Sequence, residues 1–333
     1  GLRYTAPTAM TGDTLRAALA TPSPPTVPLI TDFLFERSIF LITGEAGKGK
    51  SVITTQIGMS LTAAPTVFDS LRIPKPRTVY YMQMEGHLDE QLDRMRFMQQ
   101  AIPFEPSRFY LDGGKHTRLN AMSPASVQQK LTQIKEAMPQ PPALIVIDPI
   151  YKAVADDLAK GKPALDLINF CDLAYEAFQC SIGLVHHPHR EKYDVKGQRI
   201  EETDAYYGHS YLRNYVDLSY TFRQIGDGAE SELVRKKYRE ARSLAYLRFA
   251  YHPETYTVSM LPIASERSKT EEIDRYLRHI SRNGKTTTFA EVKQSIGVSD
   301  RLLRTRQQFY VNRHELELLK SPGKPTVWVP KLG

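Results

Sequence analysis

The segment GEAGKGKS, from Gly44 to Ser51, constrains the fold more than any other stretch of this 333-residue chain. It matches the pattern G-x-x-x-x-G-K-[ST] in full, and it lies between the apolar run SIFLIT and the helical pattern SVITTQIGMSL. Glycines allow successive backbone N–H groups to turn toward a phosphate, and the N-terminus of the following helix adds a partial positive charge. The segment therefore predicts a nucleotide site in which Lys50 reaches the β- and γ-phosphates and Ser51 binds Mg²⁺. The predicted nucleotide-binding residues in this segment are Gly44, Gly47, Lys48, Gly49, Lys50, Ser51 and Val52.

Short β-rich runs alternate with helical patterns through most of the chain, at residues 38–43, 78–84, 108–112, 143–148 and 181–187. This alternation predicts an α/β fold with a mostly parallel central sheet and crossover helices. Strands that are buried on both faces read as continuous apolar runs, and the LIVI segment at residues 144–147 fits that description. We expect an ATPase-type core domain over residues 31–262. A helix and a Pro-rich linker precede it at residues 1–30, and a small domain follows at residues 266–333.

Composition argues against a membrane protein. Hydrophobic residues make up 41% of the chain and charged residues 24%, which is ordinary for a soluble globular protein. No run approaches the ~18 apolar residues that a membrane helix requires, and we expect no secretory signal. Cys171 and Cys180 lack metal-ligand spacing, so buried free thiols are expected, which suits a reducing cytoplasm.

Two carboxylates are candidates for the chemistry of the nucleotide site. Asp148 ends the run ALIVID and is predicted to hold the Mg²⁺ shell, although a strand can also simply end in an aspartate. No acid follows Asp148, so the residue that activates the attacking water must come from elsewhere. Glu85, at the end of TVYYMQME, is the candidate, and the alternative is an exposed loop acid.

Four segments together resemble the RepA-like branch of RecA-fold ATPases, which includes hexameric replicative helicases of plasmids and phages. They are PLITDFLFERSIFLITGEAGKGKS, YYMQMEGH, ALIVIDPI and IGLVHHPHR, and the resemblance extends over residues 28–242. It implies ATP and Mg²⁺ as cofactors, a hexameric ring, His187 as a sensor of the γ-phosphate and Arg94 as a stacking partner of the adenine. In P-loop proteins of this type we expect the strand after the P-loop helix to lie beside the P-loop strand, which would bring Glu85 to the γ-phosphate as the catalytic base.

One departure from this family concerns the arginine finger. In GHSYLRNYVDLSY, Asp217 stands where the best-known plasmid helicases carry that arginine. The segment Lys237-Tyr238-Arg239 resembles the K-x-R pair that hexameric RecA-fold motors offer to the ATP of the neighbouring subunit. Arg235 and Arg213 are competitors, and a solvated basic strand end is the alternative. A finger that acts in trans would make activity depend on a homo-oligomer.

The long polar segment from Pro188 to Ser210 follows His187 directly and shows no periodicity. Long loops inside compact domains are usually functional or disordered. In RecA-like motors a loop at this position lines the central channel, which suggests contacts with single-stranded DNA. The cations predicted to contact its phosphates are Arg190, Lys192, Lys196 and Arg199.

The C-terminal segment reads as three helices, at 270–284, 289–297 and 299–310, and a hairpin at 316–330. From residue 266 onward it carries fourteen Lys or Arg against eight Asp or Glu, which accounts for most of the net charge of +7. The order of elements resembles a winged helix, which would contact duplex DNA but can also bind proteins. The predicted DNA contacts are Arg301, Arg304 and Arg306 on the third helix and Lys324 on the wing.

Two functional classes fit these features. The first is a ring-forming, ATP-driven helicase or translocase that acts on single-stranded DNA in the replication of a mobile element. The second is an ATP-switched DNA-binding loader, initiator or regulator that does not unwind DNA. A recombinase fits less well because a C-terminal winged helix is unusual for that activity, and small-molecule kinases are disfavoured by the LVHH and K-x-R segments.

Overall fold

The computed structural model describes residues 12–20, 26–113, 119–187, 210–225, 229–239, 244–261, 266–312, 315–319 and 325–331. The chain divides into two compact units, Gly1–Leu261 and Pro262–Gly333. The N-terminal helix α1 (Gly12–Ala20) forms where the sequence predicts it. Within the described part of the chain, no helix is long and apolar enough to cross a membrane.

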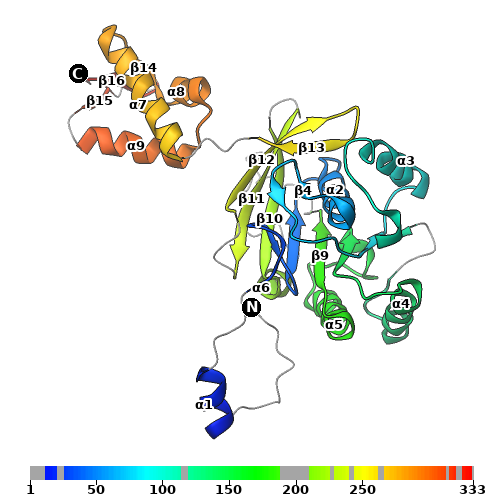
Figure 1. Ribbon diagram of the computed structural model, residues 1–333. Helices are drawn as coiled ribbons and strands as arrows, with labels where there is room; N and C mark the ends of the chain where they lie inside the picture. Colours follow the sequence, from blue (N-terminus) through cyan, green and yellow to red (C-terminus); the bar gives the residue numbers. More distant parts are fainter. Residues whose placement is uncertain are drawn as a thin grey trace. The chain divides into compact units, whose positions relative to one another are not determined.

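The larger unit is built on a nine-stranded sheet in the order β13-β12-β11-β10-β3-β9-β8-β6-β7 (Figure 1). The six strands from β10 to β7 run parallel to one another, and β11, β12 and β13 extend the sheet with antiparallel pairs. The parallel strands are β3 (Ile39–Thr43), β6 (Val79–Gln83), β7 (Phe109–Gly113), β8 (Leu144–Asp148), β9 (Ser181–His186) and β10 (Leu218–Ile225). The antiparallel strands are β11 (Glu230–Tyr238), β12 (Tyr246–His252) and β13 (Thr257–Met260). This α/β architecture, with its mostly parallel central sheet, confirms the predicted fold class.

Helices cover both faces of the sheet, which explains why its parallel strands are apolar throughout. Phe40 and Ile42 of β3 pack with the residues of α2 (Lys50–Ala63) and α3 (Leu88–Met98). The alternate residues Ile39 and Leu41 belong to a second core, which contains residues of α4 (Pro124–Ala137) and α5 (Gly161–Phe178). Figure 1 shows these two helices beside the sheet. Cys171 and Cys180 are buried free thiols in this second core, as the sequence predicts.

The prediction that the strand after the P-loop helix lies beside the P-loop strand is wrong. That strand is β6, and it pairs with β8 and β7, so β8 and β9 separate it from β3. Helix α2 nevertheless contacts β6 across the face of the sheet, because Thr54 and Tyr81 share a hydrogen bond of 2.9 Å. At its other side, α2 holds the edge strand β13 through Gln56, whose side chain bonds both the N–H and the carbonyl of Val258 (2.7 and 2.8 Å).

Smaller elements complete this unit. Two hairpins are β1–β2 and β4–β5, two 3₁₀ turns are η1 and η2, and α6 is a short helix before β10. Their bounds are β1 (Pro28–Ile30), β2 (Leu34–Phe35), β4 (Thr66–Val67), β5 (Leu71–Arg72), η1 (Pro106–Arg108), η2 (Ile150–Lys152) and α6 (Ser210–Tyr215).

The smaller unit contains three helices and a three-stranded sheet in the order β14-β16-β15. Its elements are α7 (Glu266–Arg282), β14 (Thr287–Thr288), α8 (Phe289–Ile296), α9 (Asp300–Asn312), β15 (Leu316–Leu319) and β16 (Val327–Pro330). Trp328 and Tyr310 are buried at its centre. A capping box between Thr288 and Glu291 starts α8, and the Ser299 hydroxyl accepts a hydrogen bond from the N–H of Leu302 (3.2 Å) at the start of α9. The three helices and the hairpin are thus confirmed, but α7 begins at Glu266 rather than at residue 270, and β14 is a third strand that the sequence did not predict.

Candidate nucleotide-binding site

The GEAGKGKS segment forms a loop between the C-terminal end of β3 and the N-terminus of α2. A Cβ at Gly44 would lie 2.5 Å from the carbonyl oxygen of Phe222, so this position has room only for glycine. Gly49 precedes α2 with a φ of 107°, a conformation that other residues rarely adopt. Added side chains would therefore disturb the backbone of this loop, and the N-terminus of α2 carries the partial positive charge that favours an anion. Of the remaining predicted residues, Lys48 and Val52 are half-buried beside it.

Lys50 is buried at the first position of α2, and its Nζ donates a hydrogen bond to the carbonyl of Glu45 within the loop (2.5 Å). Burial lowers the pKa of Lys50 to about 8, although Asp148, Glu45 and Glu85 oppose this shift. A buried ammonium of this kind is stabilised by an approaching anion. The position and the charge of Lys50 therefore fit a phosphate contact.

Asp148 lies at the C-terminal end of β8, two strands from the P-loop strand, and its side chain is buried. The Tyr81 hydroxyl donates a hydrogen bond to Asp148 Oδ2 (2.6 Å). Burial raises the pKa of the Asp148 carboxyl, and hydrogen bonds from Tyr81 and Ser51 oppose the rise. The Ser51 hydroxyl and the Asp148 carboxylate thus adjoin one another, and such oxygen donors are the ligands that Mg²⁺ prefers. Among the described residues, no group of three His, Cys, Asp or Glu side chains could hold a metal ion. The oxygens of Ser51 and Asp148 fit an ion whose other ligands would be phosphate and water.

Glu85 lies on the loop after β6 and faces two residues that follow β8 and β9 in the chain, Tyr151 in η2 and His187. The Tyr151 hydroxyl donates a hydrogen bond to Glu85 Oε1 (2.7 Å), and Nε2 of His187 lies 3.6 Å from Glu85 Oε2. Burial and the charge of Lys50 lower the pKa of His187, while Asp148 and Glu85 oppose this shift. Glu85 reaches the site because β6 pairs with β8, where the N–H of Met84 bonds the carbonyl of Asp148 (2.8 Å). It does not do so through a contact between β6 and β3.

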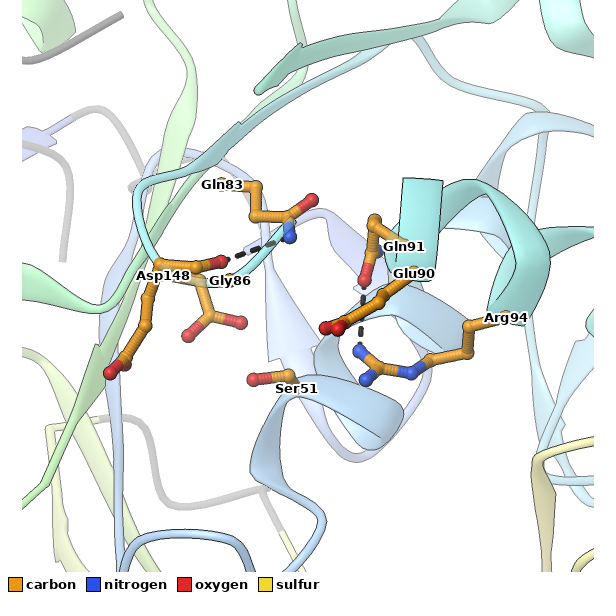
Figure 2. A pocket seen from close by; sticks show the side chains of 8 residues that line it. Ser51, Gln83, Gly86, Glu90, Gln91, Arg94 and Asp148 are labelled. Atoms are coloured by element: carbon orange, nitrogen blue, oxygen red, sulfur yellow. Dashed lines mark hydrogen bonds between the residues drawn. The ribbon is translucent and has the colours of Figure 1, made fainter. Parts of the chain in front are cut away.

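A cavity of about 180 Å³ lies between the P-loop helix and α3. Figure 2 shows Ser51 pointing into it from the start of α2, with Glu90 and Arg94 reaching in from α3. Arg94 donates a hydrogen bond to the side chain of Gln91 (2.8 Å), which fixes its guanidinium at one wall. The full lining is Ser51, Gln83, Glu85, Gly86, Glu90, Gln91, Arg94 and Asp148. The predicted metal, base and adenine residues therefore line one cavity.

Five polar residues of this site were not predicted from the sequence, namely Tyr81, Gln83, Glu90, Gln91 and Tyr151. Tyr81 could have been found by strand alternation, because in VYYMQ the residue shares a face with Val79, which packs under α2. Tyr151 stands three positions after Asp148, and Gln91 three positions before Arg94. No sequence pattern indicates that Tyr151 and Gln91 contact the site, and their role becomes visible only in the folded structure.

Lys237 and Arg239 do not lie at the cavity of their own chain. Strand β11 is antiparallel to β10, and Tyr238 is paired with Leu218, the first residue of β10, so this end of β11 lies at the sheet edge opposite the P-loop. Lys237 donates hydrogen bonds to the carbonyls of Arg213 and Asn214 (2.8 and 2.7 Å). Contact with a nucleotide would therefore require the site of another copy.

Asp217 has a structural role where a family arginine was expected. Its Oδ2 accepts a hydrogen bond from the N–H of Ile39 at the start of the P-loop strand (2.9 Å). Its Oδ1 accepts one from Arg239 (3.1 Å).

The predicted DNA-contacting residues divide into three groups. Arg304 is exposed on α9, with its guanidinium 5.3 Å from the ring centre of Phe289. Arg306 is instead engaged inside the smaller unit, because its Nε donates to Asp274 Oδ1 (2.7 Å) and a second nitrogen binds Oδ2 of the same carboxylate. This pairing contradicts the expectation that Arg306 is presented to a DNA groove. The positions that lie outside the described residues are Arg190, Lys192, Lys196, Arg199 and Lys324, together with the side chain of Arg301.

The fold and the GEAGKGKS loop define a P-loop ATPase with a RecA-like core. A family model described as an AAA domain (AAA_25) matches residues 5–192, more than half of the chain, so the chain belongs to this family of AAA domains. No curated protein matches the sequence.

Among solved structures, the chain is similar to the RadB recombinase, with 13% identity, 68% of this chain and 92% of that chain covered, and a TM-score of 0.47. It is also similar to a KaiC-like protein from Pyrococcus horikoshii, with 14% identity and a TM-score of 0.44. The match covers 71% of this chain and 97% of that chain. A third similar structure is the flagellar accessory protein FlaH from Methanocaldococcus jannaschii, with 14% identity and a TM-score of 0.45. The match covers 68% of this chain and 91% of that chain.

Proposed function

We propose that this ATPase is a ring-forming motor that translocates on single-stranded DNA and separates duplexes, with ATP and Mg²⁺ as cofactors and a hexamer as its working form. The observation that carries the hydrolytic part is the placement of Glu85 in the P-loop cavity, 3.6 Å from His187 and in contact with Tyr151. A site that only binds a nucleotide has no need of a second carboxylate beyond the metal-binding Asp148.

In the proposed reaction Glu85 acts as the general base. The water oxygen forms a bond to the γ-phosphorus while the water proton passes to Glu85. The bond between that phosphorus and the β–γ bridging oxygen breaks, and ADP leaves with the electron pair. Mg²⁺ would neutralise phosphate charge in this step, with Ser51 and Asp148 as its protein ligands. Lys50 would bind the β- and γ-phosphates, His187 would donate to the γ-phosphate, and Arg94 would stack on the adenine.

The oligomeric part of the proposal rests on Lys237 and Arg239, which lie at the sheet edge opposite the P-loop. We assign Arg239 as the finger that a second copy of the chain supplies to the ATP site. Its side chain is 47% exposed, and a neighbouring subunit would compete with Asp217 and the carbonyl of Asn214 for its guanidinium. A trans residue of this kind stabilises the charge of the transferring phosphoryl group.

A subunit-mixing experiment tests this arrangement. Lys50→Ala removes the phosphate-binding lysine from a subunit's own ATP site. Arg239→Ala removes the arginine that a subunit would supply to the ATP site of its neighbour. Each variant alone is therefore expected to be inactive. In a mixture, a Lys50→Ala subunit still supplies Arg239 to the intact P-loop of its neighbour, and part of the ATPase activity should return. Mixtures that remain as inactive as the separate variants would contradict the trans assignment. Chain mass in solution, measured by light scattering with ATP, reports ring size directly.

A second candidate function is an ATP-switched DNA-binding protein without unwinding activity. It is favoured by the smaller unit, whose three helices and three-stranded sheet resemble a winged helix and whose Arg304 is exposed on the third helix. Directional separation of a forked duplex by the full chain favours the motor. ATP that only tightens binding to duplex DNA, with no strand separation, favours the switch.

A further inference from the structure

Tyr151 is a residue to which neither the sequence patterns nor the proposed reaction assigns a role. It lies at the centre of η2, three positions after Asp148, and is half-buried. Its hydroxyl donates to Glu85 Oε1 (2.7 Å), and its ring lies 5.9 Å from the ring of His187, centre to centre. One side chain thus touches both the proposed base and the proposed sensor.

The two carboxylate oxygens of Glu85 differ in their hydrogen bonding. Oε1 is occupied by a phenol, and a bond from an O–H to a carboxylate is among the stronger hydrogen bonds in proteins. Oε2 faces His187, which follows β9, the direct neighbour of the P-loop strand. The lone pairs of Oε2 therefore remain available on the side of the cavity where the γ-phosphate would lie.

Glu85 needs such a contact, because 49% of its side chain is exposed and the residue lies on a loop. An exposed glutamate explores several rotamers, and a base that samples many positions is rarely placed for proton transfer. Tyr151 is itself restrained, because it packs against the second core and Lys152 lies over its ring (5.2 Å). Burial and the Glu85 carboxylate both raise the pKa of the Tyr151 hydroxyl, so it remains a protonated donor at neutral pH.

We propose that Tyr151 is the positioning residue for Glu85: it holds Oε1 by a hydrogen bond and so turns Oε2 toward the attacking water. The proposal rests on the proposed function, since it needs Glu85 to be the base. Tyr151 takes no part in proton transfer itself, and its effect on turnover passes entirely through the carboxylate. Removing both the Tyr151 hydroxyl and the Glu85 carboxylate should therefore lower kcat no further than removing the carboxylate alone.

A double-mutant cycle tests this, with kcat and KM for ATP measured on the full chain and binding of ATP followed separately. Glu85→Gln keeps the shape but removes the basicity, and a loss of about 10²–10⁴-fold in kcat is expected. Tyr151→Phe keeps the ring against His187 and removes only the hydroxyl. We expect kcat to fall about tenfold, the size of one charged hydrogen bond to a half-exposed group, with KM within about twofold of wild type. The double variant should match Glu85→Gln alone.

Tyr110→Phe, at a half-buried tyrosine of β7, is the matched control and should turn over as wild type. As a second variant, Tyr151→4-aminophenylalanine restores an N–H donor and should recover part of the lost kcat. The proposal is overturned if Tyr151→Phe keeps wild-type kcat, or if the losses of the two single variants multiply in the double variant. Wild-type turnover in Glu85→Gln would instead refute the assignment of the base, and the role of Tyr151 would fall with it.

Discussion

Asp217→Ala is expected to destabilise the larger unit through one buried backbone group rather than through an ion pair. The Asp217 side chain is 4% exposed, and its Oδ2 accepts the N–H of Ile39 at the start of the P-loop strand (2.9 Å). Truncation leaves that buried N–H without an acceptor, which costs about 1–3 kcal/mol. The ion pair with Arg239 (3.1 Å) adds little, because the arginine is 47% exposed and pairs of this kind are worth about 0–1 kcal/mol. We therefore expect a loss of about 2 kcal/mol in the free energy of unfolding.

The matched control is Arg239→Ala, which removes the same ion pair but leaves the N–H of Ile39 bonded to Asp217. It should cost less than about 1 kcal/mol. Urea unfolding followed by far-UV circular dichroism measures both variants. The only tryptophan, Trp328, lies in the smaller unit, so its fluorescence gives an internal reference that neither variant should shift. Equal losses for Asp217→Ala and Arg239→Ala would refute the reasoning.

Three further predictions concern other contacts. Asp112→Ala should lower the free energy of unfolding by about 3–5 kcal/mol in the same urea assay. The reason is that the buried Lys130 ammonium, which lies 2.7 Å from the Asp112 carboxylate, would lose its partner of opposite charge. A loss below about 1 kcal/mol would contradict this prediction. Burial raises the pKa of Cys180 from 9.0 to about 12, so the neutral thiol contributes stability that is complete below pH 9 and lost as the pH rises toward 12. Loss of stability between pH 9 and 12 should therefore be smaller in Cys180→Ala, and a thiol reagent at pH 8 should label wild-type Cys180 only after unfolding. Gly44→Ala places a Cβ 2.5 Å from the carbonyl oxygen of Phe222, so the P-loop must shift. The affinity for ATP, measured by calorimetric titration, should fall by at least about tenfold. An unchanged affinity would show that the loop tolerates the methyl group.

The strands of the core were predictable from the sequence because burial on both faces leaves apolar runs such as residues 144–147. Their order was not, because local sequence does not state how many strands a crossover helix passes, and β6 lies beside β8 rather than beside β3. The position of the glycines, Lys50 and Ser51 between β3 and α2 could be predicted from their spacing alone, because this loop is a local structure.

Residues whose partners are distant in sequence were the ones that pattern reasoning missed. Tyr151 and Glu85 are separated by 66 positions and meet only because η2 follows β8. Arg306 looks like a surface cation on α9, yet Asp274, 32 positions earlier on α7, binds it in two places. From the sequence, Asp217 indicates only that an arginine is missing, whereas in the fold its carboxylate binds the N–H of Ile39 at the start of the P-loop strand.

The most direct test of the proposed motor is ATP hydrolysis by the full chain with no DNA, with single-stranded DNA and with duplex DNA, and with Lys50→Ala measured under the same conditions. The account predicts hydrolysis that Lys50→Ala abolishes and that single strands stimulate more strongly than duplex. Hydrolysis that is indifferent to single strands would contradict the motor and favour the ATP-switched DNA-binding protein in its place.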